Sequence, residues 1–434
     1  MAKQEVSPVS GKTNFLYSIL FVNAMRLFFL AASLVNGKAR RGFVGRRKLF
    51  HDLEKKLEKI PHGKRVWFHA SSLGEFEQAK PIIELMKESG YKTVVTFFSP
   101  SGHDYSLNYP FADVVTYIPF DTKKNARRFV ELVSPAAVIV MRYDLWLNHL
   151  VEARKHGAKV MLADATFPTK LLRRSAFIKE FFRELYQCCD AILTTTIEHR
   201  KMFDSFIGEG KAEVAGDTRY DRVHARSVTN SVLEKLPLRI DRSRRTVVVM
   251  GSTWPQDIDV LTGALKKLTE EYPELLILIV PHEPTSDEVR KLSAAFTGTM
   301  ILSELDGTTE GFSFLIVDRV GLLTQLYVLG DIAYVGGGFG SGVHNVLEPA
   351  VYGIPIITGP RIERSDEAVA LMKEGALFYV KDSEDSYEIL RRMISDRSAR
   401  EKAGTTAKNF VDRHLGASIF VADKIKLMCG GSPQ

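Results

Sequence analysis

Two successive series of short apolar segments, alternating with helical segments, constrain the fold of this chain most. The first series comprises residues 65–70, 92–98, 136–141, 159–165, 191–196 and 212–216. The second comprises residues 246–252, 275–281, 312–318, 332–338, 354–359 and 377–382. Continuous apolar runs of this length are typical of strands buried on both faces of a parallel sheet. We therefore expect an α/β chain with two doubly wound domains and a cleft between them.

The domain boundaries follow from length and polarity. A chain of 434 residues exceeds one ordinary hydrophobic core. The polar stretch 219–245 separates the two series and predicts the junction. We assign residues 1–40 to an N-terminal segment, 41–225 to a first domain and 226–434 to a second.

The N-terminal segment Phe15–Val35 is long and apolar enough to cross a bilayer, although it contains Asn23 and Arg26. Basic residues crowd the next stretch, 38–48, and favour a cytoplasmic body after a membrane segment. The segment predicts membrane association, either spanning or lying on the surface. The alternative is an amphipathic helix packed on the protein itself.

The net charge of +7 suits an acidic partner, such as nucleic acid, an anionic lipid surface or a phosphorylated substrate, and also an ordinary basic surface. The three cysteines form no CxxC pattern, and no metal-ligand spacing is evident, so we expect no metal site.

The strongest motif is GGGFGSGVHNVLEPAVYGIPIITGP, residues 336–360. Glycines such as Gly337 and Gly338 let backbone N–H groups approach a ligand, and a helix beginning near Leu347 favours a phosphate. His344 precedes this helix, and Glu348 in its first turn could accept hydrogen bonds from ribose hydroxyls. A tight turn with a capped helix is the alternative. We predict a nucleotide site.

Two other strand ends could complete that site. Ser252 and Thr253 follow one strand and could bind an anion, and Pro281 and His282 follow another. Ligands collect outside the carboxyl ends of strands in doubly wound sheets. Each segment alone could equally be a loop with a helix cap.

In the first half, SSLGEFEQAKP follows the strand at 65–70. Pro81 predicts the first turn of the next helix, which would leave Glu75 in the strand-to-helix turn. A carboxylate there could take the proton from an attacking hydroxyl. The alternative is a first-turn glutamate favoured by the helix dipole.

Polar residues at other strand ends of the first half could line an acceptor site. These residues are Ser72, Gly74, Ser99, Ser101 and Gly102. Asp144 follows the third strand with Arg142 and Trp146, and Arg219 lies in GDTRYD, where it could neutralise a leaving phosphate. Each segment could also be an ordinary polar loop.

In their order, these motifs resemble those of the 3-deoxy-D-manno-octulosonic acid (Kdo) transferases of lipopolysaccharide synthesis. The resemblance covers nearly the whole chain through HASSLGEFEQAKP, TFFSPSGHD, YIPFD, DLW, AGDTRYD, GST and the glycine-rich run. It implies the GT-B fold, two Rossmann-like domains facing a central cleft. It also implies a glycosyltransferase on the cytoplasmic face of the bacterial inner membrane. That enzyme would transfer Kdo from CMP-Kdo to the lipid A precursor, lipid IVA, with inversion, and with neither a cofactor nor a nucleic-acid partner.

The resemblance also implies residue roles. The base falls on Glu75, and stabilisation of the transition state falls on Asp144 and Arg219. Donor-binding positions fall on Pro281, His282, Val320, Gly321, Leu322, Asn345, Val346, Leu347 and Glu348. The chain departs from the commoner pattern at four positions: His282 replaces an arginine, Arg219 a lysine, Asp144 a glutamate and Arg142 an acidic residue.

Three alternatives remain. Another GT-B transferase using a UDP-sugar, or a nonhydrolysing nucleotide-sugar epimerase, would share the glycine-rich run but not SSLGEFEQAKP together with the apolar segment. An inactive membrane-associated binding protein could use the same fold. The presence of Glu75 and Glu348 argues against it.

Overall fold

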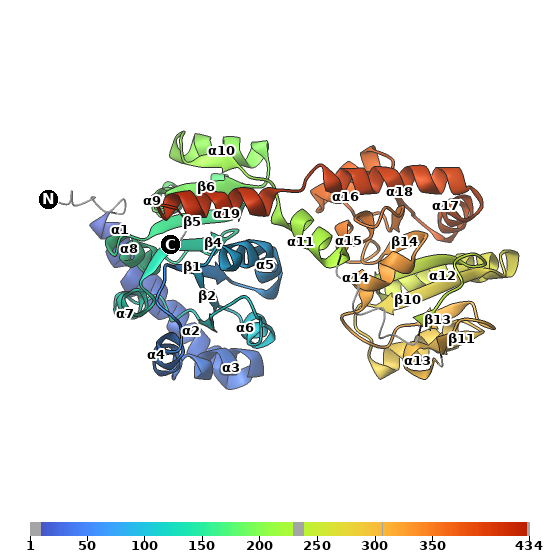
Figure 1. The fold of residues 1–434 in the computed structure, drawn as a ribbon, viewed down its shortest axis with the longest axis horizontal. Helices are drawn as coiled ribbons and strands as arrows, with labels where there is room; N and C mark the ends of the chain where they lie inside the picture. Colours follow the sequence, from blue (N-terminus) through green and yellow to red (C-terminus); the bar gives the residue numbers. More distant parts are fainter. Residues whose placement is uncertain (1–9, 229–237, 306, 432–434) are drawn as a thin grey trace. The chain divides into compact units, whose positions relative to one another are not determined.

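Both expected parallel sheets are present in the computed structural model, which describes residues 10–228, 238–305 and 307–431 (Figure 1). Each sheet has seven strands and lies in its own unit of the chain. The first unit runs to Arg222 and resumes at Gly416, and the second unit lies between these points. The two doubly wound domains expected from the sequence are confirmed.

The first sheet has the order β3-β2-β1-β4-β5-β6-β7, with all neighbouring strands parallel. Its strands are β1 (Arg65–Ala70), β2 (Lys92–Phe97), β3 (Val114–Tyr117), β4 (Pro135–Met141), β5 (Lys159–Ala165), β6 (Ala191–Thr194) and β7 (Ala212–Val214). The chain leaves β1 toward one edge and returns at β4 on the other side. The gap between the ends of β1 and β4 is therefore the topological switch point, where such sheets bind ligands.

The second sheet repeats this arrangement with the order β11-β13-β10-β9-β14-β15-β16. Its strands are β9 (Thr246–Thr253), β10 (Leu275–Pro281), β11 (Thr299–Ile301), β13 (Phe314–Ile316), β14 (Ile332–Val335), β15 (Ile356–Thr358) and β16 (Leu377–Tyr379), and β8 (Leu238–Arg239) pairs separately with β12 (Gly307–Thr308). Its switch point lies between the ends of β9 and β14.

Helices cover both faces of each sheet because strand side chains point alternately to opposite faces. On β1, Trp67 belongs to one buried cluster and Phe68 to the other. The first unit contains α1 (Gly11–Leu16), α2 (Val22–Val35), α3 (Gly37–Gly45), α4 (Leu49–Glu58), α5 (Leu73–Glu88), α6 (Pro100–Ser106), α7 (Lys123–Val133), α8 (Leu147–Lys155), α9 (Ala176–Gln187), α10 (Ile197–Ile207) and α19 (Ala417–Met428), and α11 (Thr218–Ser227) crosses into the second. The second unit contains α12 (Pro255–Glu271), α13 (Ser286–Ala295), α14 (Leu323–Leu326), α15 (Leu347–Ala350), α16 (Asp366–Lys373), α17 (Ser383–Ser395) and α18 (Arg397–Asp412).

The last helix, α19, packs with the first unit and not with the second, to which the sequence pattern had assigned residues up to 434. Figure 1 shows it in red beside the first sheet. Asp221 fixes its start by accepting hydrogen bonds from the N–H groups of Gly416 at 2.7 Å and Ser418 at 2.6 Å. A boundary drawn from strand order alone cannot detect a helix that returns to the first sheet.

The prediction that Pro81 opens a helix is wrong. Helix α5 begins at Leu73, and the Ser72 hydroxyl caps it by accepting from the N–H of Glu75 at 3.4 Å. Pro81 therefore lies inside the helix, where the missing N–H removes one backbone hydrogen bond. Glu75 consequently lies in the first helical turn rather than in a loop.

The N-terminal segment is one continuous helical stretch, formed by α1, the π-helical turn η1 (Tyr17–Phe21) and α2. Within it, Thr13–Val35 is long and apolar enough to cross a bilayer, and most of its residues are exposed. Three of its residues are buried, namely Tyr17 and Val22, which belong to a core cluster of the first unit, and Ser33. The segment thus combines one face packed on the protein with a largely exposed apolar remainder.

Candidate functional site

The predicted residues of the first unit gather at the carboxyl ends of its strands. His69 and Glu75 lie at the end of β1, Ser99 follows β2, and Asp144 follows β4. Since β2, β1 and β4 are consecutive neighbours in the sheet, these residues share one edge at the switch point.

A hydrogen bond joins the two sides of this switch point. Nε2 of His69 lies 2.9 Å from Oδ2 of Asp144, and Nδ1 of His69 lies 2.9 Å from Oγ1 of Thr96 on β2. The indole N–H of Trp146 donates to the same Asp144 oxygen at 3.1 Å. Burial alone would raise the pKa of Asp144, but the hydrogen bonds from His69 and Trp146 outweigh it and lower the pKa. Asp144 is therefore held as a carboxylate.

Glu75 has the opposite electrostatic balance. Its side chain is 4% exposed, and its Oε2 accepts from the N–H of Ser71 at 2.5 Å. Burial raises the pKa of Glu75, the Ser71 N–H lowers it in part, and the negative charge of Asp144 raises it further. A carboxylate with a raised pKa is a stronger base, which suits proton abstraction.

His69 was not among the predicted residues because it lies inside a strand pattern, where a histidine is usually an ordinary buried residue. Asp164, at the end of β5, was not among them either. Asp164 is 1% exposed, has a positive φ of 51°, and its carboxylate accepts from the N–H of Thr218 at 3.2 Å and from the Thr218 hydroxyl. Burial, with the nearby charge of Asp217, raises the pKa of Asp164. A polar residue ending a buried strand was the available signal.

Arg142 and Arg219 supply positive charge to this edge. Arg142 has a positive φ of 62°, and its Nε is buried without a hydrogen-bond partner within the described residues. Its charge lowers the pKa of both Glu75 and Asp164, though in each case burial acts more strongly. Arg219 is paired with Asp217, with 2.8 Å between Nε and Oδ2. Arg219 would have to weaken this pair to reach a phosphate.

The predicted acceptor residues divide into two groups. The hydroxyls of Ser99 and Ser101 lie 2.7 Å apart at the exposed start of α6, and Ser72 caps α5. Gly102 is buried, and a Cβ there would lie 2.6 Å from Phe97. Close packing of α6 on β2 therefore accounts for this glycine.

The second unit has a comparable link across its own switch point. The indole N–H of Trp254, after β9, donates to Nε2 of His344, after β14, at 2.7 Å. The ring of His282 stacks on Trp254 at 4.5 Å and on His344 at 4.7 Å. Burial and the neighbouring His282 lower the pKa of His344, which keeps its Nε2 available as the acceptor. The predicted residues His282 and His344 are thus in contact, and Trp254 joins them.

The glycine-rich loop after β14 is held against the end of β9. A Cβ at Gly336 would lie 2.2 Å from the carbonyl oxygen of Ser252, and Gly337 has a positive φ of 91°. The buried carboxylate of Asp257 accepts from the N–H groups of both Trp254 and Gly337 at 2.9 Å. Asp257, which the sequence analysis also missed, therefore fixes the loop relative to β9.

The helix expected after this loop is short, comprising only α15 (Leu347–Ala350). Oδ1 of Asn345 accepts from the N–H of Leu347 at 3.2 Å, and the Asn345 amide donates to Glu348 at 3.3 Å. Arg226 lies 3.9 Å from the same Glu348 oxygen. The side chain of Glu348 is thus oriented by Asn345 and Arg226.

The remaining donor positions lie at neighbouring strand ends. Val320, Gly321 and Leu322 follow β13, which is adjacent to β10 and Pro281. Two polar atoms at these ends are buried without a hydrogen-bond partner within the described residues, Oγ1 of Thr253 and Oδ1 of Asp318. Unpaired buried polar atoms are costly and are often satisfied by a ligand or water.

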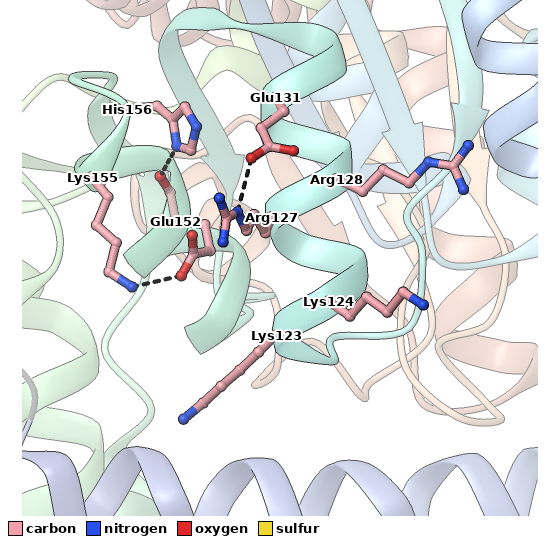
Figure 2. A pocket seen from close by; sticks show the side chains of 8 residues that line it. All are labelled: Lys123, Lys124, Arg127, Arg128, Glu131, Glu152, Lys155 and His156. Atoms are coloured by element: carbon pink, nitrogen blue, oxygen red, sulfur yellow. Dashed lines mark hydrogen bonds and ion pairs between the residues drawn. The ribbon is translucent and has the colours of Figure 1, made fainter.

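A separate basic groove of about 750 Å³ lies on α7 and α8 and contains none of the predicted site residues. Figure 2 shows Lys123 and Lys124 extending from the start of α7, while Arg127 pairs with Glu131 and Lys155 with Glu152. Including Arg128, five cationic side chains meet two carboxylates, so the groove carries net positive charge.

Comparison with known proteins agrees with this geometry. A family model described as 3-deoxy-D-manno-octulosonic-acid transferase (kdotransferase) matches residues 38–222. A 3-deoxy-D-manno-octulosonic acid transferase of Chlamydia muridarum is 26% identical over 411 residues, 93% of each chain. That of Chlamydophila psittaci is 30% identical over 333 residues, which cover 74% of this chain and 76% of the relative.

Solved structures share the fold at low identity. UDP-GlcNAc 2-epimerase from Neisseria meningitidis has a TM-score of 0.58 at 16% identity, covering 81% of this chain and 99% of that one. MurG of Acinetobacter baumannii has a TM-score of 0.54 at 14% identity, covering 84% and 100%. Together with the two parallel-sheet units, these likenesses confirm the expected GT-B fold.

Proposed function

This chain belongs to the 3-deoxy-D-manno-octulosonic acid (Kdo) transferase family, and from that premise we propose that it transfers Kdo from CMP-Kdo to the phosphorylated lipid A precursor, lipid IVA. It is a glycosyltransferase of lipopolysaccharide biosynthesis. The proposal adds the acceptor, the stereochemical course, the residue roles and the place of the reaction.

Glu75 is the proposed general base. Its Oε2 is held by the Ser71 N–H, which leaves Oε1 to take the proton of an acceptor hydroxyl. The hydroxyl oxygen forms a bond to the anomeric carbon of Kdo, the bond from that carbon to the CMP phosphate oxygen breaks, and the configuration inverts. The carboxylate of Asp144, fixed by His69 and Trp146, favours positive charge developing at the anomeric carbon.

The proposed donor residues bind CMP and take up the charge of its departing phosphate. The hydroxyl of Thr253 suits phosphate oxygens and Glu348 suits the ribose hydroxyls, while the N–H of Gly337 already donates to Asp257. Arg219 is the proposed cation for the leaving phosphate after it exchanges its pair with Asp217. The scheme uses positioning and electrostatics and requires no metal.

One observation supports a lipid acceptor: two aromatic contacts connect the apolar N-terminal helix to Trp146, which is bonded to Asp144. Phe29 of α2 packs edge-to-face on Phe98 after β2, with ring centroids 5.0 Å apart. Phe98 stacks at 5.3 Å on Trp146, which donates to Asp144. An exposed apolar helix beside the reactive carboxylates suits a substrate that resides in a bilayer.

We propose that this helix lies in the membrane surface at the cytoplasmic face of the inner membrane. The Tyr17 hydroxyl donates to buried Asp121 at 2.8 Å, and Ser18 donates to Asn148 at 3.0 Å. With the Phe29 contact, these bonds hold both halves of the helix on the protein, whereas a spanning helix would have to leave it. Its exposed residues, such as Leu27 and Phe28, would enter the lipid, as in interfacial helices.

Basic side chains support an anionic surface as the partner. Arg40, Arg41 and Arg47 on or after α3 are exposed, and the basic α7–α8 groove belongs to the same unit. Arg46, also part of the basic stretch, is engaged instead by the carbonyl oxygens of Phe98 and Ile118. The surface attraction should weaken with salt.

The proposed function is tested by measuring Kdo transfer directly. Full-length protein is incubated with CMP-Kdo and lipid IVA in detergent, and the lipid product is analysed by mass spectrometry. A Kdo-sized mass increase on the lipid, dependent on Glu75, supports the proposal. Transfer to another acceptor only, or epimerisation of a UDP-sugar, contradicts it.

A further inference from the structure

An apolar groove of about 540 Å³ lies in the first unit between the N-terminal helix, α9 and the loop after β4. Leu20 and Phe21 line it from η1, Phe177 and Phe181 from α9, and Tyr143 and Asp144 from the loop. Its volume falls within the range of about 300–1,000 Å³ typical of ligand sites. The geometry points to a binding site for one fatty acyl chain of the lipid acceptor, an inference that rests on the proposed function.

The groove is built rather than incidental. The ring of Tyr17 stacks on Phe181 at 5.5 Å and on Phe21 at 5.3 Å. The hydroxyl of Tyr17 is bonded to Asp121, which accepts from the N–H groups of Asn148 and His149, so this aromatic wall is fixed to the start of α8. Among the residues that line the groove, Asp144 alone carries charge, and its Oδ2 is occupied by His69 and Trp146. An apolar ligand therefore suits the lining, while a free sugar would find few polar partners.

The lining of the groove identifies the ligand. It includes Asp144 and Trp146, which belong to the reactive edge described above. It also includes Leu20 and Phe177, which are 63% and 60% exposed, and Leu20 belongs to the helix proposed to lie in the bilayer. The groove runs from Thr13 to Phe21 along the helix, roughly 12 Å at 1.5 Å per residue. A chain entering from the lipid would thus end beside the reactive carboxylates with its sugar attached.

The groove is lined both by the exposed apolar helix and by the edge that holds Asp144. We therefore assign it to an acyl chain of the acceptor itself. An acyl chain of a bulk phospholipid would bring no acceptor sugar to Asp144. A second copy of this protein or a helix of a partner would cover the groove at all times and would block its opening toward the reactive edge. These occupants are outcomes of the test.

The test uses full-length protein in detergent and a series of phosphorylated glucosamine disaccharides that differ only in acyl chain length. For chains short enough that the acceptor is dissolved as monomers outside the micelles, KM of the unaltered protein should fall by about fourfold per added methylene until the groove is filled. Leu20→Asp and Phe177→Asp should raise KM for the long-chain acceptors tenfold or more. Both variants should leave KM for the acceptor without acyl chains unchanged, with kcat retained.

The matched control is Leu27→Asp. Leu27 lies on the same apolar stretch and is 66% exposed, close to Leu20 at 63%, but it does not line the groove. In detergent it should behave as the unaltered protein. Phe177 lies on α9 and Leu20 on η1. If Leu20→Asp disturbs the N-terminal helix, Phe177→Asp still tests the groove.

Several outcomes overturn the inference. Equal effects of Leu20→Asp and Leu27→Asp would place the effect in membrane contact rather than in the groove. A KM that does not depend on acyl chain length would assign the groove to another occupant. So would a labelling experiment in which self-association of the protein protects Phe177. Absence of transfer to every acceptor would instead reject the proposed function. Displacement of a fluorescent fatty acid by lipid IVA, lost in Phe177→Asp, tests the groove without turnover.

Discussion

Nε2 of His69, on β1, lies 2.9 Å from Oδ2 of Asp144, on the loop after β4, and so links the two strand ends at the switch point of the first sheet. A second link, from Trp254 to His344, occupies the corresponding place in the second sheet. Each link fixes a loop whose conformation the strands alone would not determine. Each candidate site therefore contains a residue, His69 or Trp254, that positions a predicted one.

Replacing His69 by phenylalanine should test the first link. The variant removes one hydrogen bond to the Asp144 carboxylate, a loss of about 1.5–3 kcal/mol for a bond to a charged group. We expect kcat/KM to fall by about 10- to 150-fold. Because His69 lowers the pKa of both Asp144 and Glu75, the acid limb of the pH–rate profile should also move to higher pH. An unchanged acid limb would show that His69 acts only in packing.

Glu75→Gln should reduce kcat by about 10²–10⁴-fold, the usual contribution of a general base, and leave the affinity for CMP unchanged. Burial raises the pKa of Glu75. As the pH is lowered, activity should therefore be lost at a pH higher than the usual glutamate pKa of about 4.3. The folded-state pKa lies above the unfolded one, so ionised Glu75 destabilises the native protein at neutral pH. Glu75→Gln should therefore raise Tm there, measured by scanning calorimetry, and a lower Tm would contradict this environment.

Glu348→Ala should weaken CMP binding by about 10- to 100-fold in calorimetry, since it removes a charged acceptor for ribose hydroxyls. Glu363→Ala is the matched control, because Glu363 is an exposed glutamate of the same unit. Equal affinities of the two variants would remove Glu348 from the donor site.

Substituting Leu27, Phe28 and Leu34 together by serine should abolish flotation with anionic liposomes while preserving activity on detergent-dispersed acceptor. All three side chains are exposed, at 66%, 67% and 82%. Deleting the helix is a poorer test because Tyr17 and Val22 belong to the core. Raising the salt concentration should weaken flotation of the unaltered protein. If the triple variant floats as well as the unaltered protein, the helix does not have the proposed surface role.

Much of the fold could be predicted because its signals are local. Buried strands such as 65–70 are continuous apolar runs, and the structure has β1 at those residues. Strand β3 (Val114–Tyr117) and strand β11 (Thr299–Ile301) were missed. All three residues of β11 are only partly buried, so it lacks the continuous apolar run of a strand buried on both faces. The start of α5 was misplaced because the proline signal was trusted over the Ser72 cap.

Candidate site residues could be named from the sequence where they belong to a recognisable motif, as do Glu75 and Asp144. His69 and Asp257 gave no such signal, because one lies within a strand pattern and the other is an ordinary first-turn acid of a helix. Their importance comes from contacts of 2.9 Å to residues far away in sequence, with Asp144 and Gly337, which only the folded sheet creates. The apolar groove of the first unit is likewise lined by segments that lie far apart along the chain.

The most direct test of the account is the lipid product of Glu75→Gln and the unaltered protein, measured side by side by mass spectrometry with CMP-Kdo and lipid IVA. CMP affinity is measured on the same preparations. The account predicts a Kdo-bearing lipid from the unaltered protein, at least a hundredfold less from Glu75→Gln, and equal CMP affinity. Comparable product from both proteins would contradict the account.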